Sequence, residues 1–169
     1  VVSANQGGQG PERDRWCSFP EPLYRFQRIG ALLDAREQHD LDSLLAISYD
    51  AFDVSAERLL PVWAPLLPEH PLADALRAFA RDQRDRRVLG LFHKLHEETC
   101  FALFAADIDV ADARRFREYS AVVFYQPRLD SLLALEEPDV LGAAELRAHL
   151  AVAFPRAIAD FGPHQVPVR

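Results

Sequence analysis

Methionine is absent from the 169 residues of this chain, and lysine occurs once, at Lys94. Because translation starts with Met, a chain without any Met is expected to be processed or trimmed. The small, polar start, VVSANQGGQG, is typical of the residues that follow a removed leader peptide. The sequence therefore predicts a periplasmic or secreted protein, and a cytoplasmic location is the open alternative.

Long apolar runs are also missing. No stretch of about 18 consecutive apolar residues occurs, so no transmembrane segment is expected. The formal net charge is −7 at pH 7, which disfavours nucleic acid and anionic membranes as partners. The remaining composition, 49% hydrophobic and 27% charged, is that of an ordinary globular protein, and 169 residues suit one domain with one core.

Cysteine is scarce, with Cys17 and Cys100 as the two examples. In an exported protein an even number of cysteines suggests a disulfide, which would stabilise the fold by closing a long loop. In the cytoplasm both would be free thiols, and a buried cysteine behaves as a small apolar residue. The sequence leaves both possibilities open, with the disulfide tied to export.

Known catalytic signatures are missing as well. The chain contains no HExxH, CxxCH, helical ExxH or GxSxG pattern, and its NQGGQG run does not stand between a strand and a helix. These absences exclude the common motif-defined zinc, haem, di-iron, serine-hydrolase and phosphate-loop enzymes. No catalytic residue is therefore assigned.

Helical periodicity dominates what is present, because apolar residues recur at spacings of three and four. The sequence predicts an all-α, single-domain bundle of about six or seven helices over residues 20–169, behind a flexible N-terminal tail, residues 1–19. A short strand is an alternative near the end of the fifth stretch. The expected helical stretches are 22–36, 41–52, 56–67, 71–107, 111–125, 128–137 and 142–161.

Several residues are expected to begin or interrupt these helices. Asp40 and Ser55 are suited to cap the second and third stretches. Pro61 is expected to kink or break the third stretch, and Pro155 to interrupt the last. Gly90 indicates a kink, a break or a close crossing within the long fourth stretch.

The hexapeptide LDSLLA occurs twice, at 41–46 and at 129–134. In a chain rich in Leu and Ala, coincidence is favoured over duplication. No repeat period supports a repeat architecture.

The segment from Val88 to Phe104 concentrates the most potential chemistry. On a helix, His93, His96 and Cys100 stand at i, i+3 and i+7 and form one stripe between core and solvent. Imidazole and thiolate groups are ligands for Zn, Cu or haem iron, so one hypothesis is a metal site at these three residues. The plainer interpretation is a histidine pair hydrogen-bonded to its neighbours, with the cysteine buried or bridged.

Aromatic residues are too numerous to fill one face, so some are expected at a surface or a pocket. Trp63, in the proline-framed segment LLPVWAPLLP, and Phe101, which projects away from the apolar face of its helix, are the candidate partner-binding residues. The first hypothesis is therefore a helical binding or accessory protein for a partner protein or apolar ligand. The alternative is a metal- or haem-dependent enzyme or metal carrier.

Overall fold

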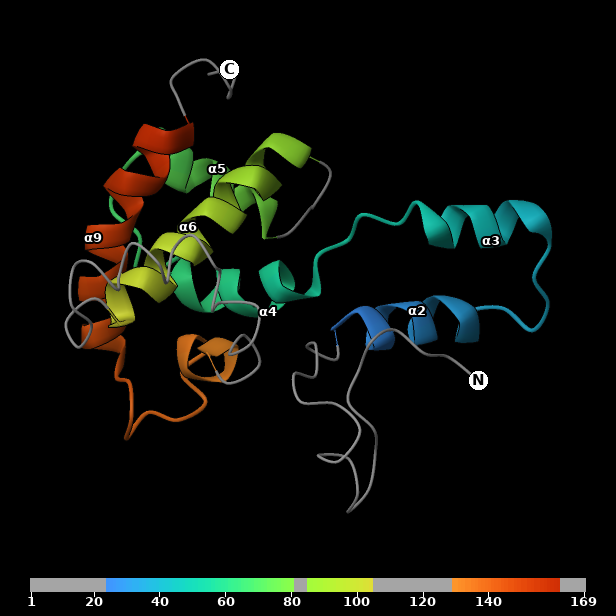
Figure 1. Ribbon diagram of the computed structural model, residues 1–169, viewed down its shortest axis with the longest axis horizontal. Helices are drawn as coiled ribbons and strands as arrows, with labels where there is room; N and C mark the ends of the chain where they lie inside the picture. The colour runs from blue at the N-terminus through green and yellow to red at the C-terminus, as the bar shows by residue number, and fades with distance from the viewer. Residues whose placement is uncertain (1–23, 81–84, 105–128, 162–169) are drawn as a thin grey trace. The chain divides into compact units, whose positions relative to one another are not determined.

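The computed structural model describes residues 24–80, 85–104 and 129–161. All regular structure in these ranges is helical, which confirms the all-α prediction (Figure 1). The chain divides into two compact units, Val1–Val54 and Ser55–Arg169, and each is described by itself. The predicted tail and the fifth predicted helix lie outside the described residues, and the domain boundary at residue 20 stays a prediction.

The first unit contains a pair of contacting helices, α2 (Tyr24–Asp34) and α3 (Leu41–Ser48). They run antiparallel (Figure 1). The Arg28 guanidinium ties them together, because it donates to both carboxylate oxygens of Asp50, at 2.8 and 2.9 Å. The same guanidinium lies 4.3 Å above the centre of the Phe52 ring. This planar group therefore fixes the residues that follow α3 against α2.

Asp40 caps α3, as the sequence predicts. Its Oδ1 accepts from the backbone N–H of Ser43 at 2.9 Å, and its own N–H donates to Ser43 Oγ at 3.0 Å. This reciprocal arrangement satisfies two backbone donors that a helix start otherwise leaves unpaired. The hydrogen bond from the Ser43 backbone is also the main reason why the pKa of Asp40 lies below its usual value.

The second unit is a helical bundle. Its main helix pair is α6 and α9, which pack along each other, and α5 also contacts α6 (Figure 1). Its elements are α4 (Val54–Trp63), α5 (Pro71–Phe79), α6 (Arg86–Phe104), a short helical turn at 129–133, and α9 (Ala143–Phe161). The largest fully buried side chains include Leu59, Leu60, Trp63, Leu76, Leu91, Phe92, Leu95, Leu146 and Leu150.

The prediction of one helix over 71–107 is wrong, because α5 and α6 are separate helices. The second starts just after Asp85, whose Oδ1 accepts from the backbone N–H groups of Arg87 at 2.9 Å and Val88 at 3.4 Å. A carboxylate at a helix start satisfies unpaired N–H groups and opposes the positive end of the helix dipole. The run of charged residues therefore contains a helix start that periodicity alone does not reveal.

The two interior prolines do not end their helices, so the predicted interruption at Pro155 is wrong, whereas at Pro61 only the break is excluded and the kink stays a prediction. Pro61 lies inside α4 and Pro155 inside α9, and both are exposed. Buried residues on either side, such as Leu60 and Trp63 in α4, anchor the flanking turns in the core and hold the helix together across the missing N–H. Ser55 is likewise not a cap, because α4 begins at Val54.

Gly90 marks a close helix crossing, which is one of the three expected possibilities. It lies within α6, and a β-carbon at this position would stand 3.3 Å from Cε2 of Phe161 at the end of α9. Phe161 packs against the core of the second unit. The missing side chain at Gly90 thus lets the end of α9 approach the backbone of α6.

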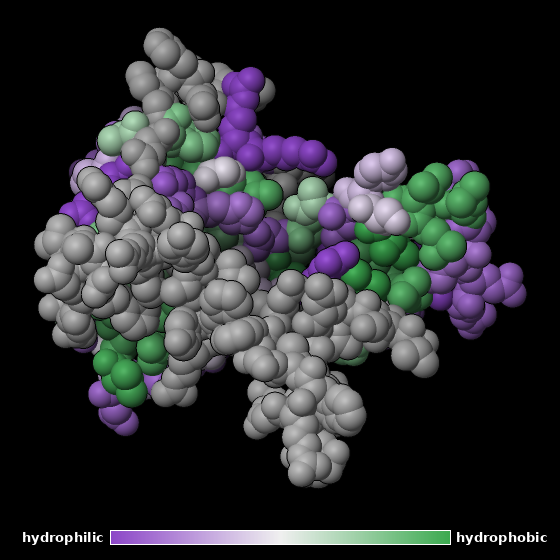
Figure 2. Space-filling view, in the orientation of Figure 1, coloured by the Kyte–Doolittle hydropathy of each residue, from purple (hydrophilic) through white to green (hydrophobic). Residues whose placement is uncertain are grey.

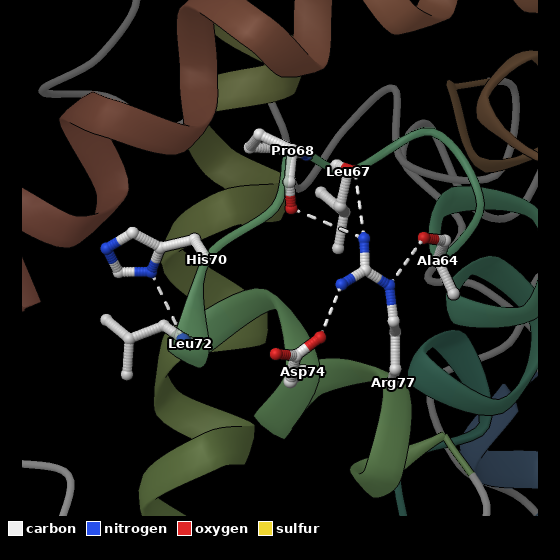
Figure 3. A network of polar contacts seen from close by, with 7 residues as sticks. All are labelled: Ala64, Leu67, Pro68, His70, Leu72, Asp74 and Arg77. Carbon is white, nitrogen blue, oxygen red and sulfur yellow. Dashed lines mark hydrogen bonds and ion pairs between the residues drawn. The ribbon is translucent and has the colours of Figure 1, made fainter. Parts of the chain in front are cut away.

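Arg77 on α5 holds the turn that precedes this helix (Figure 3). Its guanidinium donates to the carbonyl oxygens of Ala64 at 3.0 Å, Leu67 at 2.9 Å and Pro68 at 3.3 Å, and it pairs with Asp74 at 2.7 Å. These carbonyls follow the end of α4 at Trp63, where a guanidinium can supply hydrogen-bond donors to several of them at once. One side chain thereby orders the connection from α4 to α5.

No helix among the described residues is long and apolar enough to cross a bilayer. This agrees with the sequence-based expectation for the same stretches. The predicted periplasmic or secreted location stays a prediction.

Candidate functional site

The three predicted metal ligands lie on one uninterrupted helix, as the spacing requires, but they do not share an environment. His96 and Cys100 are buried, with 7% and 0% of their surface exposed, whereas His93 is exposed. Cys100 Sγ lies 3.9 Å from Nε2 of His96 one helical turn away. The structure therefore brings two of the three residues together.

The buried imidazole has a partner that sequence reasoning missed. Nε2 of His96 donates to Oδ1 of Asp130, at 2.7 Å, and Asp130 is fully buried. Asp130 belongs to the helical turn at 129–133, so this contact joins α6 to a segment 34 residues further along the chain. We call His96, Cys100 and Asp130 the buried polar cluster.

Electrostatics keep the imidazole of this cluster protonated. Burial by itself lowers the pKa of His96, because a charged ring loses its hydration. The interactions with Cys100 and the hydrogen bond to Asp130 outweigh that effect and raise the pKa to about 10. At neutral pH the contact between His96 and Asp130 is therefore a buried ion pair.

Aromatic rings surround the imidazole. The Trp63 indole is stacked on His96 at a centroid distance of 6.0 Å and an angle of 15°, and Phe92 lies 6.0 Å away at 39°. Trp63 Nε1 also donates to the carbonyl of Leu133 at 2.9 Å. The helical turn is thus bound to α6 through Asp130 and to α4 through the indole.

The end of this helical turn is fixed by its own backbone. Leu135 has a φ of 56°, and its N–H donates to Leu132 O at 2.9 Å, while Glu136 N–H donates to Ser131 O at 3.0 Å. These two bonds form the Schellman arrangement that closes many helices. Arg58 on α4 adds a bond to Ser131 Oγ at 3.1 Å, so the turn is held on several sides.

The metal hypothesis finds no support. In the described parts of the chain, no group of three or more His, Cys, Asp or Glu side chains could hold a metal ion. A ligand role for His93, His96 and Cys100 therefore stays a prediction, and the plainer interpretation of a hydrogen-bonded histidine fits His96. The predicted disulfide is not seen either: Cys100 is a free, buried cysteine, and Cys17 lies outside the described residues.

The two predicted partner-binding aromatics do not lie on an open surface. Trp63 is fully buried, because its indole packs in the core and donates a hydrogen bond there. Phe101 is half-buried, and the Arg156 guanidinium of α9 lies 5.9 Å from its ring centre. Partner binding through these residues stays a prediction.

The buried polar cluster contains the residue types of a nucleophile, a base and an orienting acid, but not their arrangement. In such a triad, the nucleophile and the acid contact different nitrogens of the imidazole. Here Cys100 and Asp130 both face Nε2 of His96. A protonated, buried His96 also cannot accept a proton at neutral pH, and a substrate has no access to a fully buried thiol.

A contact between a hydroxyl and an imidazole occurs in the first unit. His39 Nδ1 lies 3.3 Å from Ser43 Oγ, and its Nε2 lies 2.8 Å from Leu33 O. Ser43 Oγ also donates to Asp40 O at 2.9 Å, as part of the cap described above. This pair fastens the connection between α2 and α3, and its hydroxyl is engaged in capping.

Comparison with known proteins gives one result. The family model described as penicillin amidase matches residues 1–164 of this chain. No curated protein matches the chain, and no solved structure matches it.

Proposed function

The chain belongs to the penicillin amidase family, and from this premise we propose that the protein hydrolyses an amide bond of an acylated amine such as a penicillin. The observation that carries the proposal is the match over residues 1–164, which spans almost the whole chain. Amide hydrolysis requires an accessible nucleophile, a proton acceptor and donors that stabilise the developing oxyanion.

We further propose that the helices described above are scaffold for this reaction and that the buried polar cluster takes no part in it. The burial of Cys100 supports this assignment, since a nucleophile must reach the substrate. The raised pKa of His96 supports it too, because the ring is already protonated when a base is needed. The cluster then serves to hold the turn at 129–133 on α6.

The test is an amidase assay on the full-length protein with benzylpenicillin as the probe. Cleavage of the acyl side chain releases a primary amine, whereas opening of the β-lactam ring does not, so a reagent specific for primary amines separates the two reactions. We expect primary amine to appear at a rate proportional to protein concentration. Failure to release amine from benzylpenicillin and from a panel of acylated 4-nitroanilides would refute the amidase proposal.

The scaffold assignment is tested by Cys100→Ala in the same assay. We expect the rate per folded molecule to stay within about twofold of wild type, because the proposal gives the fully buried Cys100 no contact with substrate. Loss of a nucleophile that acts in catalysis costs several orders of magnitude. A rate reduced by a hundredfold or more, with an unchanged circular dichroism spectrum, would show that the cysteine acts in catalysis.

A binding role is the second candidate function, and one observation favours it. Four large apolar side chains are exposed on or next to α3. Figure 2 shows hydrophobic surface over this helix. Binding and amide hydrolysis are compatible in one protein.

A further inference from the structure

The first turn of α5 is capped by a histidine, His70, which directly precedes the helix. Its Nδ1 accepts from the backbone N–H of Leu72 at 3.1 Å (Figure 3). Pro71 at the first helical position has no N–H, so Leu72 carries the first donor of α5 that needs a partner outside the helix. Because a backbone N–H can only donate, Nδ1 must hold a lone pair and the ring proton must lie on Nε2. The cap therefore requires the neutral imidazole.

Protonation of this ring removes the cap. The usual capping residues, Asn, Ser and Thr, keep their acceptor oxygen in mild acid, whereas imidazole is the group that changes charge there. A doubly protonated ring carries an N–H on each nitrogen and cannot accept from Leu72. Its positive charge would also lie at the positive end of the dipole of α5. A gain of one proton by His70 thus acts against the start of this helix in two ways.

The surroundings of the ring offer no carboxylate to compensate that charge. His70 is half-buried, and its ring meets the ring of Phe154 on α9 edge to face, with centroids 5.5 Å apart at an angle of 78°. Within residues 24–80, 85–104 and 129–161, no acidic side chain forms an ion pair with this imidazole. The preceding carboxylate, that of Glu69, is exposed, and solvent screens it.

The other charged side chains on the elements around the ring are engaged elsewhere. The helices concerned are α5 itself, α6, which contacts α5, and α9, which carries Phe154. Their charged groups with partners are Asp74 with Arg77 on α5, Lys94 with Glu97 and Glu98 on α6, and Glu145 with His149 and Arg156 with Phe101 on α9.

A second contact holds the same connection independently of pH. Arg77 donates to the carbonyl oxygens of Leu67 and Pro68, just before His70 (Figure 3). A guanidinium does not lose its proton in proteins, so these bonds persist when the imidazole is protonated. Loss of the cap therefore loosens the first turn of α5 and leaves the rest of the connection from α4 attached.

We propose that the start of α5 is a pH-sensitive switch, in which neutral His70 caps the helix and protonation in mild acid frees its first turn. The cap stabilises the turn while the ring is neutral and is lost as the pH falls. Local opening of α5 thereby becomes easier in acid, while Arg77 keeps the helix connected to α4.

The test is hydrogen exchange of the Leu72 backbone amide, followed by NMR in the full chain at about pH 7.5 and about pH 5. Conversion to protection factors removes the intrinsic pH dependence of exchange. We expect protection to fall about fivefold between the two pH values, as the loss of an N-cap implies. His70→Asn supplies an acceptor oxygen that does not titrate, so it is expected to keep its protection in acid. His70→Ala is expected to have low protection at both pH values.

The matched control is His149→Gln, which removes another partly exposed histidine, on α9. It is expected to keep the pH dependence of wild type. Leu72 protection that does not change with pH in wild type, a fall that persists in His70→Asn, or a fall that disappears in His149→Gln would overturn the proposal. The ¹⁵N signals of the His70 ring give a second readout, because Nδ1 must be unprotonated at pH 7.5, and a proton on it would also overturn the proposal. Neither readout depends on amide hydrolysis.

Discussion

Removal of the Asp130 carboxylate is the perturbation with the largest expected effect. In the Asp130→Ala variant, the protonated His96 keeps its buried position but loses the acceptor that lies 2.7 Å away. Breaking a buried ion pair by deleting one partner costs about 3–5 kcal/mol, because the other charge is left without compensation. The indole of Trp63 and the ring of Phe92 beside it offer no acceptor of comparable strength.

The raised pKa of His96, to which Cys100 contributes ahead of Asp130, also makes the stability of the fold depend on pH. A rise from the usual 6.5 to about 10 corresponds to ~5 kcal/mol of preference for the charged ring, at about 1.36 kcal/mol per pH unit. The folded-state pKa is raised, so this stabilisation is fully present below pH 6.5 and is lost as the pH rises through about 10. Between these values the wild-type free energy of unfolding is expected to fall by ~1.4 kcal/mol per pH unit on account of this residue.

The assay is urea unfolding at a series of pH values between 6 and 10, followed by circular dichroism. We expect Asp130→Ala to lose about 3–5 kcal/mol at pH 6.5 and to show a smaller decline with pH than wild type. The matched control is Glu145→Gln, which removes the carboxylate 3.9 Å from the partly exposed His149 and should cost under about 0.5 kcal/mol. A loss below about 1 kcal/mol for Asp130→Ala, with the pH dependence of wild type, would refute the reasoning.

Three further variants test separate parts of the fold by urea unfolding. Trp63→Phe removes the indole donor to the Leu133 carbonyl and leaves that oxygen unpaired, so we expect a loss of about 1–3 kcal/mol; an unchanged midpoint would contradict the hydrogen bond. Arg77→Lys replaces a planar fork that reaches three carbonyls by a single ammonium, and we expect a loss of about 1–2 kcal/mol, whereas full retention of stability would contradict the clamp. Gly90→Leu forces a large side chain against Phe161, and we expect a loss of about 1–3 kcal/mol, whereas a gain in stability would contradict the close crossing.

The helical character of the chain was predictable, because apolar residues recur at spacings of three and four over segments long enough to identify a helix without knowledge of its neighbours. The cap at Asp40 was also predictable locally, because an aspartate directly before a helical pattern is a typical N-cap. The break between α5 and α6 was not, because apolar spacing continues past the charged run and only the side chain of Asp85 marks the new start. The continuity of α4 and α9 through Pro61 and Pro155 depends on core packing, which has no signature in a short stretch of sequence.

The candidate site was predictable only in part. Helical spacing predicted one stripe between core and solvent for His93, His96 and Cys100, and the structure buries the last two and exposes His93. The partner, Asp130, lies 34 residues further along the chain, and nothing in local periodicity connects the two. Its one signal was an aspartate inside the apolar run LDSLLAL, where a buried acid requires a cation or donors. The burial of Trp63 was missed because its flanking prolines suggested a surface segment.

The central claim is that the buried polar cluster, with His96 protonated, holds α6 to the turn at 129–133. The most direct measurement is an NMR titration of His96 in protein labelled with ¹⁵N at histidine, assigned with a His96→Gln variant. The account predicts that both ring nitrogens remain protonated through pH 8.5 and that the titration is centred near pH 10. An imidazole that titrates between pH 6 and 7 would contradict the buried ion pair and would leave His96 available as a base.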